Sequence, residues 1–135
     1  MNLGLSACEG HISRSDKMKE ITIDNDMKFE DYKKSRLFEN SKRFCAEQGF
    51  RLYIRRSSRG NVHVKVMDNE GIDFDELFSF KVRALLSDDP NRLKLDLIRS
   101  LMNKSINRLW DHKFKDGKLN TAGRWQRVIL IRKDK

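Results

Sequence analysis

The sequence predicts an α+β fold, in which a mainly antiparallel sheet has helices packed on one face. Two patterns lead to this prediction. Several short segments alternate apolar and polar residues, as half-buried strands do, and the segments between them repeat apolar residues every three or four positions, as amphipathic helices do. Their order is strand, helix, strand, strand, helix and then further strands, which is typical of a two-layer sandwich. The second face of the sheet is therefore expected to be open.

The length and composition predict a single domain. The chain has 135 residues, of which 38% are hydrophobic, so it can bury one core and leaves little room for a second. Residues 1–17 show neither periodicity and are expected to form a flexible N-terminal arm before a domain in residues 18–135. The first residues, MNLGLSACEG, lack the basic head and long apolar run that are typical of a signal peptide, and no apolar run approaches the about 18 residues that span a membrane. These features predict a soluble cytoplasmic protein whose cysteines are reduced.

The first predicted elements are a strand and a helix. Ile21 and Ile23 alternate with Thr22, which indicates a half-buried strand, and the same alternation places both following acids, Asp24 and Asp26, on one face. Apolar side chains then recur at helical spacing over residues 29–45, and Gly49 follows as a stop signal. One amphipathic helix is expected there.

A β-hairpin is expected next. Residues 50–56 and 61–66 both alternate, and the turn-forming sequence SSRG separates them. Val62, Val64 and Val66 share the apolar face of the second strand, so His63 and Lys65 point to the opposite face. In the first strand, Tyr53 and Arg55 share a face opposite to the leucine and isoleucine between them.

The rest of the chain contains one clear helix and several weaker signals. Residues 74–87 are predicted to be helical up to the acids before Pro90. The following segment, residues 91–102, alternates first and then takes helical spacing, so a short strand leading into a helix is expected. Residues 106–114 and 125–132 are strand candidates. Their aromatic residues have apolar neighbours, which favours a place in the core over base stacking (Trp110, Phe114, Trp125).

Pleat parity gathers ionisable residues on the open face. If the isoleucines and valines pack against the helices, six side chains emerge together on the other side of the sheet (Asp24, Asp26, Tyr53, Arg55, His63, Lys65). Two carboxylates at this spacing are able to share Mg²⁺ or Mn²⁺ with phosphate oxygens. The same two acids also fit an ordinary polar strand end.

The charge balance favours a polyanionic partner. The formal net charge is +9, and basic residues concentrate in two tracts, residues 51–66 and 113–135. We therefore expect nucleic acid binding, with DNA favoured over RNA, no membrane binding, and contacts from six arginines (Arg51, Arg55, Arg56, Arg59, Arg124, Arg127). The turn at Ser57 and Ser58 is either a plain hairpin turn or a phosphate cradle, because hydroxyl and backbone N–H groups are both present there.

The combination resembles a known family. The order ITIDND, an amphipathic helix, and FRLYIRRSSRGNVHVKV is similar to the first two motifs of archaeo-eukaryotic primases and primase-polymerases over residues 20–66. The resemblance implies an RRM-like palm, metal ligands at Asp24 and Asp26, and contacts from His63 to the phosphates of a nucleoside triphosphate. It assigns supporting roles at this nucleotide site to two serines and a lysine (Ser57, Ser58, Lys65).

The family's third motif is an acid on a later strand. Asp96, in the sequence RLKLD, is the candidate for it. The segment LLSDDPNRLKLDLIR, followed by RLWDHK, is also similar to small proteins of archaeal viruses and plasmids, which favours a mobile genetic element as the origin.

Three functions stay open from the sequence. The first is metal-dependent nucleotidyl transfer in replication by a minimal palm. The second is a non-catalytic module that binds DNA or RNA on a palm-like sheet. The third is a small assembly or regulatory protein, which would show an extensive apolar patch outside the sheet.

Overall fold

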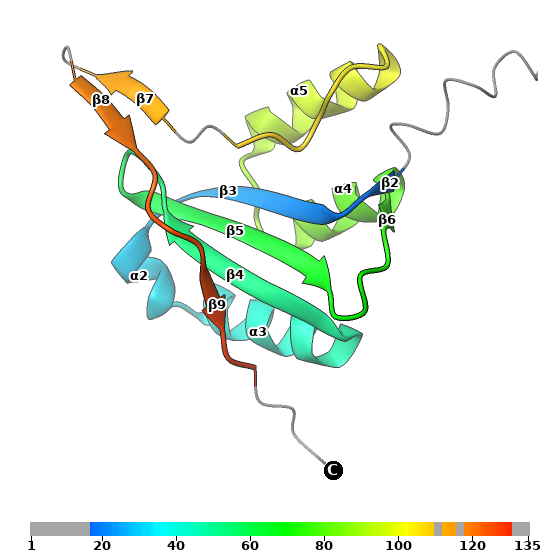
Figure 1. Cartoon of the computed structure of the whole chain (residues 1–135), viewed down its shortest axis with the longest axis horizontal. Coiled ribbons are helices and arrows are strands. Elements are labelled where there is room, and N and C mark those ends of the chain that lie inside the picture. Colours follow the sequence, from blue (N-terminus) through cyan, green and yellow to red (C-terminus); the bar gives the residue numbers. More distant parts are fainter. Residues whose placement is uncertain (1–16, 110–111, 116–117, 131–135) are drawn as a thin grey trace, which may run out of the picture.

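The computed structural model describes residues 17–109, 112–115 and 118–130 (Figure 1). Its central feature is an antiparallel four-stranded sheet in the order β3-β5-β4-β9. The strands are β3 (Glu20–Lys28), β5 (Asn61–Asp68), β4 (Phe50–Arg56) and β9 (Gln126–Val128). Two pairs of short strands lie outside this sheet: β2 (Lys17–Met18) with β6 (Phe74–Asp75), and β7 (His112–Lys115) with β8 (Lys118–Thr121). The predicted α+β class and antiparallel sheet are confirmed.

Three helices cover one face of the sheet, and the core lies beneath them. These are α2 (Phe29–Lys33), α3 (Arg36–Gln48) and α4 (Glu76–Leu85) (Figure 1). The apolar strand residues that the alternation predicted are buried (Ile21, Ile23, Leu52, Ile54, Val62, Val64, Val66). They share one core cluster with aromatic residues of the helices (Phe29, Tyr32, Phe38) and with Phe74 of β6. The hairpin prediction is confirmed in its pairing, since Leu52 lies opposite Val66 and Ile54 opposite Val64.

The predicted helix over residues 29–45 is two helices. The chain turns at Lys34, and Ser35 then caps α3 by accepting a hydrogen bond from the backbone N–H of Phe38. Gly49 ends α3 as predicted, with the positive φ of 78° that an L side chain rarely adopts. The next helix starts later than expected, because Asp75 caps α4 by accepting from the backbone N–H of Phe78.

The short strand predicted at the start of residues 91–102 is wrong. This segment is the helix α5 (Pro90–Leu101), which begins where Asp89 accepts a hydrogen bond from the backbone N–H of Asn91 and proline occupies the first turn. The helix lies beyond the β3 edge of the sheet and packs on α4 (Figure 1). The strand predicted over residues 106–114 is wrong over residues 106–109, which form no strand; His112–Lys115 is β7.

Some predictions fall wholly or partly on residues that the structure does not describe. Residues 1–16 of the proposed arm and Trp110 lie outside them, while Lys17 belongs to β2. The last predicted strand, residues 125–132, is shorter and corresponds to β9. Within the described ranges, each helix is too short or too polar to cross a membrane.

Candidate functional site

Three polar side chains form a row across the open face of the sheet. Asp24 of β3 lies directly opposite His63 of β5, which in turn lies opposite Arg55 of β4. The Asp24 Oδ1 atom is 3.7 Å from His63 Nε2, and the Arg55 Nε–H donates a 3.0 Å hydrogen bond to His63 Nδ1. Pleat parity therefore predicted correctly that the acid and the histidine meet on this face.

The contact with Arg55 fixes the orientation of the imidazole. Because Nδ1 accepts a hydrogen bond, the neutral ring carries its proton on Nε2, the atom that faces the Asp24 carboxylate. His63 and Arg55 are both buried. The Asp24 side chain keeps 38% of its surface exposed, so it is the accessible end of the row.

An aromatic and cationic cluster lies beside this row. Trp125, just before β9, places its indole over the Arg55 guanidinium and the Lys65 ammonium, with ring-centre distances of 4.4 and 4.5 Å. Lys65 also lies 5.1 Å from the ring centre of Tyr53, and Arg127 of β9 is opposite Tyr53 in the sheet. We call these five residues the Trp125 cluster. Its indole is partly exposed, which contradicts the prediction of a core tryptophan.

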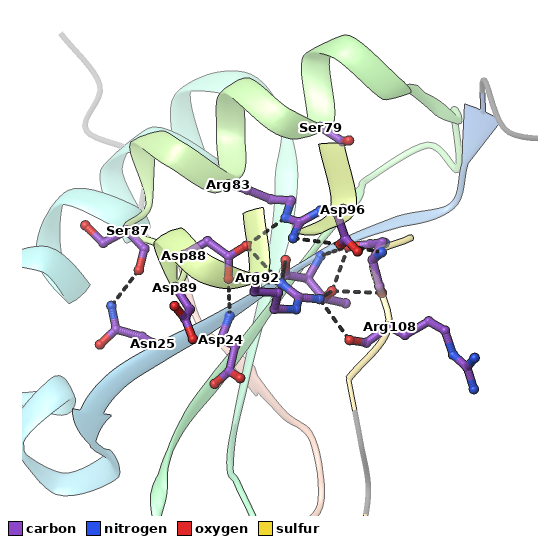
Figure 2. A network of polar contacts seen from close by, with 12 residues as sticks. Asp24, Asn25, Ser79, Arg83, Ser87, Asp88, Asp89, Arg92, Asp96 and Arg108 are labelled. Atoms are coloured by element: carbon purple, nitrogen blue, oxygen red, sulfur yellow. Dashed lines mark hydrogen bonds and ion pairs between the residues drawn. The ribbon is translucent and has the colours of Figure 1, made fainter. Parts of the chain in front are cut away.

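The carboxyl group of Asp24 is held in an unusual environment. Burial raises the pKa of Asp24 to about 6 from 3.8. The nearby Arg92 guanidinium opposes this shift, and the carboxylates of Asp88, Asp89 and Asp26 add to it. The side chain points away from the network that holds its own backbone (Figure 2). The Asp24 carboxyl therefore gains or loses its proton near pH 6, well above the pH at which an ordinary aspartate does so.

That network covers the outer edge of β3. The Asp24 backbone N–H donates to the Asp88 carboxylate at 2.7 Å, and the Asp24 carbonyl accepts from the Asp89 N–H at 2.8 Å (Figure 2). Further along, the Asn107 amide accepts from the Thr22 N–H and donates to the Glu20 carbonyl. These groups occupy the position of a further strand, and the turn after α5 thereby covers Thr22 on the face that was expected to be open.

Asp96 does not join the proposed acidic set. It lies on α5 and not on a strand, and its buried carboxylate pairs with the Arg83 guanidinium at 2.9 Å (Figure 2). The same oxygen accepts from the Asn107 backbone N–H. Arg83 also pairs with Asp88, which pairs in turn with Arg92. Asp96 thus serves to hold α4, α5 and the turn together, and the role that the resemblance implied for it has no geometric support.

The two acids of the DxD motif differ in their surroundings. Asp26 is exposed, in a part of β3 where the pairing with β5 is irregular between Asn25 and Lys28. Asn25 contributes to this bulge by accepting from the Met27 N–H. Across the ranges that the structure describes, no group of three or more His, Cys, Asp or Glu side chains is placed to hold a metal ion.

The Ser57 turn uses most of its polar groups internally. The Ser57 hydroxyl accepts from the backbone N–H groups of Arg59 and Asn61, and the Gly60 N–H donates to the Ser57 carbonyl. This geometry matches the plain hairpin turn, because three of the N–H groups of the proposed phosphate cradle already have acceptors. Ser58 lies in the same turn and is half-buried.

The predicted arginines divide between the two faces. Arg55 and Arg127 belong to the Trp125 cluster, and Arg51 donates to the Tyr53 hydroxyl beside it. Arg56 lies on the helical side, where it pairs with Glu30 at 3.1 Å, so it is not part of the same surface. Arg59 and Arg124 are exposed in loops.

Three of the important residues were missed by sequence reasoning. Asp88 follows the end of the predicted helix, and Asn107 fell within the strand predicted over residues 106–114. Neither pattern indicated that these two residues cover the edge of β3. The signal that existed for Trp125 was its position between Arg124 and Arg127, because cations beside an aromatic residue are typical of a binding surface.

Comparison with protein-family models, with curated proteins and with solved structures gave no match. The resemblance to primase-polymerases therefore depends on the motifs of this chain alone, and a function has to be inferred from the geometry of its own residues.

Proposed function

We propose that the protein binds nucleic acid through the open face of its central sheet. The observation that carries this proposal is the partly exposed Trp125 indole lying over Arg55 and Lys65. Cations neutralise backbone phosphates, and an accessible aromatic ring stacks on bases, so their combination suits a nucleic acid. The net charge of +9 adds long-range attraction for the same partner.

The experiment is a titration of fluorescently labelled oligonucleotides of DNA and RNA, followed by anisotropy. We expect the double variant Lys65→Ala, Arg127→Ala to bind about tenfold more weakly, because each lost cation removes a phosphate contact. The matched control is Arg43→Ala, Lys81→Ala, which removes the same charge from exposed positions on α3 and α4. Equal weakening in both double variants would mean that net charge, and not this face, determines binding.

Metal-dependent nucleotidyl transfer is a second candidate, favoured by the Asp24–His63 contact of 3.7 Å. The resemblance implies Mg²⁺ or Mn²⁺ and a nucleoside triphosphate. The side chains within the described ranges include no three-ligand group for such an ion, so we derive no step through it. Asp24 and His63 remain the residues that this candidate requires.

Primer synthesis by the purified protein tests the second candidate. Labelled nucleotides, a DNA template and Mn²⁺ are supplied, and products are resolved on a gel. The candidate expects synthesis that disappears in Asp24→Ala. An absence of synthesis, or synthesis that Asp24→Ala leaves unchanged, counts against it and in favour of the binding module.

A further inference from the structure

The helix α5 turns its apolar side to solvent. Its inward side carries Asp96, which is buried against Arg83, and Arg92, which reaches the edge of β3. Four large apolar residues of the exposed side and Met102, directly after the helix, form what we call the α5 strip (Leu95, Leu97, Ile98, Leu101, Met102). Leu101 is the most exposed of them, at 88%. A surface helix ordinarily shows the reverse arrangement, so this strip indicates a contact surface.

The strip is large enough to matter energetically. Its five side chains expose roughly 500 Å² of surface, which reaches the upper part of the about 300–600 Å² found for the largest apolar patch of a monomer. Leaving this area in water costs free energy that burial against a partner recovers. The sequence also left open an assembly or regulatory role, for which an apolar patch outside the sheet was the expected mark.

The residues around the strip are basic. Lys94, Arg99 and Lys104 are all exposed on α5 or directly after it. Between residues 90 and 109 the single acid is Asp96, and its carboxylate is buried in the ion pair with Arg83. The α5 strip is therefore apolar in its middle and positively charged at its border.

We propose that the α5 strip docks an amphipathic helix of another protein, whose apolar face is bordered by acidic residues. The apolar faces of two helices then pack side by side, and carboxylates on the partner meet the basic border. This contact is separate from the Trp125 cluster, so it does not depend on the proposed nucleic-acid binding.

Charge and composition argue against the other occupants. A second copy would bring two basic borders together, which like-charge repulsion disfavours. A membrane surface is also disfavoured, because the strip holds no aromatic residue and Lys94 lies one helical turn before Ile98, on the same side of the helix.

The test uses the full-length protein and two synthetic peptides. Both are 18-residue amphipathic helices with leucines on one side, and their flanks carry glutamates in one peptide and lysines in the other. We expect the glutamate peptide to bind at least tenfold more tightly, as measured by peptide fluorescence anisotropy. Leu101→Gln should weaken its binding at least tenfold, and the matched variant Leu85→Gln, at a 59% exposed leucine of α4, should not. Both positions are exposed, so both variants should fold.

Several outcomes would overturn the proposal. One is the absence of binding, and another is equal binding of both peptides or equal weakening by both leucine variants. Self-association in sedimentation that Leu101→Gln abolishes would assign the strip to a second copy. Binding to vesicles of phosphatidylserine and phosphatidylcholine that the same variant abolishes would assign it to a membrane surface.

Discussion

Asp24 combines two roles within one residue. Its backbone N–H and carbonyl are fixed by Asp88 and Asp89, while its carboxylate faces the His63 ring across the strand pair. The network holds the backbone, and the side chain stays available for chemistry. A substitution of the side chain should therefore report on the site with little effect on the network.

The raised pKa of Asp24 predicts a pH-dependent contribution to stability. Because this pKa is about 6 in the folded chain and 3.8 ordinarily, the folded state binds the proton more tightly, and the free energy of unfolding falls as pH rises between these values. Asp24→Asn should remove this fall and stabilise the protein at pH 7 by about 1 kcal/mol, a figure reduced for the exposure of the side chain. Urea unfolding of both proteins from pH 4 to 7 measures the difference; parallel profiles would contradict the prediction.

Arg83 is the residue whose loss should cost most. It is fully buried and pairs with both Asp88 and Asp96, so Arg83→Met leaves the buried Asp96 carboxylate without its cation and leaves Asp88 with Arg92 alone. We expect a loss of about 3–5 kcal/mol in the free energy of unfolding, measured with urea. Adding Asp96→Asn should recover part of the loss, because it removes the charge that Arg83→Met leaves uncompensated. An additive further loss in that double variant would show that the pairs do not act as one network.

Predictions for single residues were correct where the alternation along a strand determines which face a side chain occupies. They were wrong where contacts with distant residues determine its role. Alternation around buried valines places His63 on the open face whatever the rest of the chain does. The role of Asp96 depends on whether its segment is a strand or a helix, and on a partner thirteen residues earlier, Arg83. No local pattern contains that information.

At the scale of elements, the edge of β3 is closed by side chains where another strand would lie. Asn107 is central, because its amide bonds the Thr22 N–H and the Glu20 carbonyl while its backbone has a φ of 68°. The adjacent helix α5 shows why a strand was wrongly predicted there. The leucines at positions 93, 95 and 97 alternate as in a strand, but Leu95 and Leu97 face solvent on α5.

Substitutions at Asn107 separate its two contributions. Asn107→Gly keeps the positive φ and loses the amide, so it should cost about 1–3 kcal/mol from unpaired edge groups. Asn107→Ala adds backbone strain and should cost about 1 kcal/mol more. Hydrogen exchange at the Thr22 N–H, followed by NMR, should accelerate in both variants, and protection equal to that of the wild type would contradict the edge role.

At the scale of the whole molecule, the structure separates two surfaces of different chemistry. The Trp125 cluster lies on the open face of the sheet. The α5 strip belongs to α5, which lies beyond the β3 edge of the sheet (Figure 1). The overall layering was predictable, because seven buried strand residues follow the alternation rule. The position of α5 could not be predicted from the sequence. Polar groups attach this helix to the edge of the sheet, and a pattern of hydrophobic residues carries no information about such contacts.

The separation of the surfaces predicts how binding should respond to salt. If phosphates contact Lys65 and Arg127, the logarithm of the association constant for single-stranded DNA should fall steeply with the logarithm of salt concentration, by about 0.7 per phosphate neutralised. Removing both cations should reduce this slope by about 1.4, and Arg43→Ala, Lys81→Ala should leave it unchanged. Leu101→Gln should also leave it unchanged, since α5 belongs to the other surface. Anisotropy titrations from 50 to 300 mM salt measure all four slopes; an unchanged slope in the Lys65, Arg127 variant would place the phosphates elsewhere on the molecule.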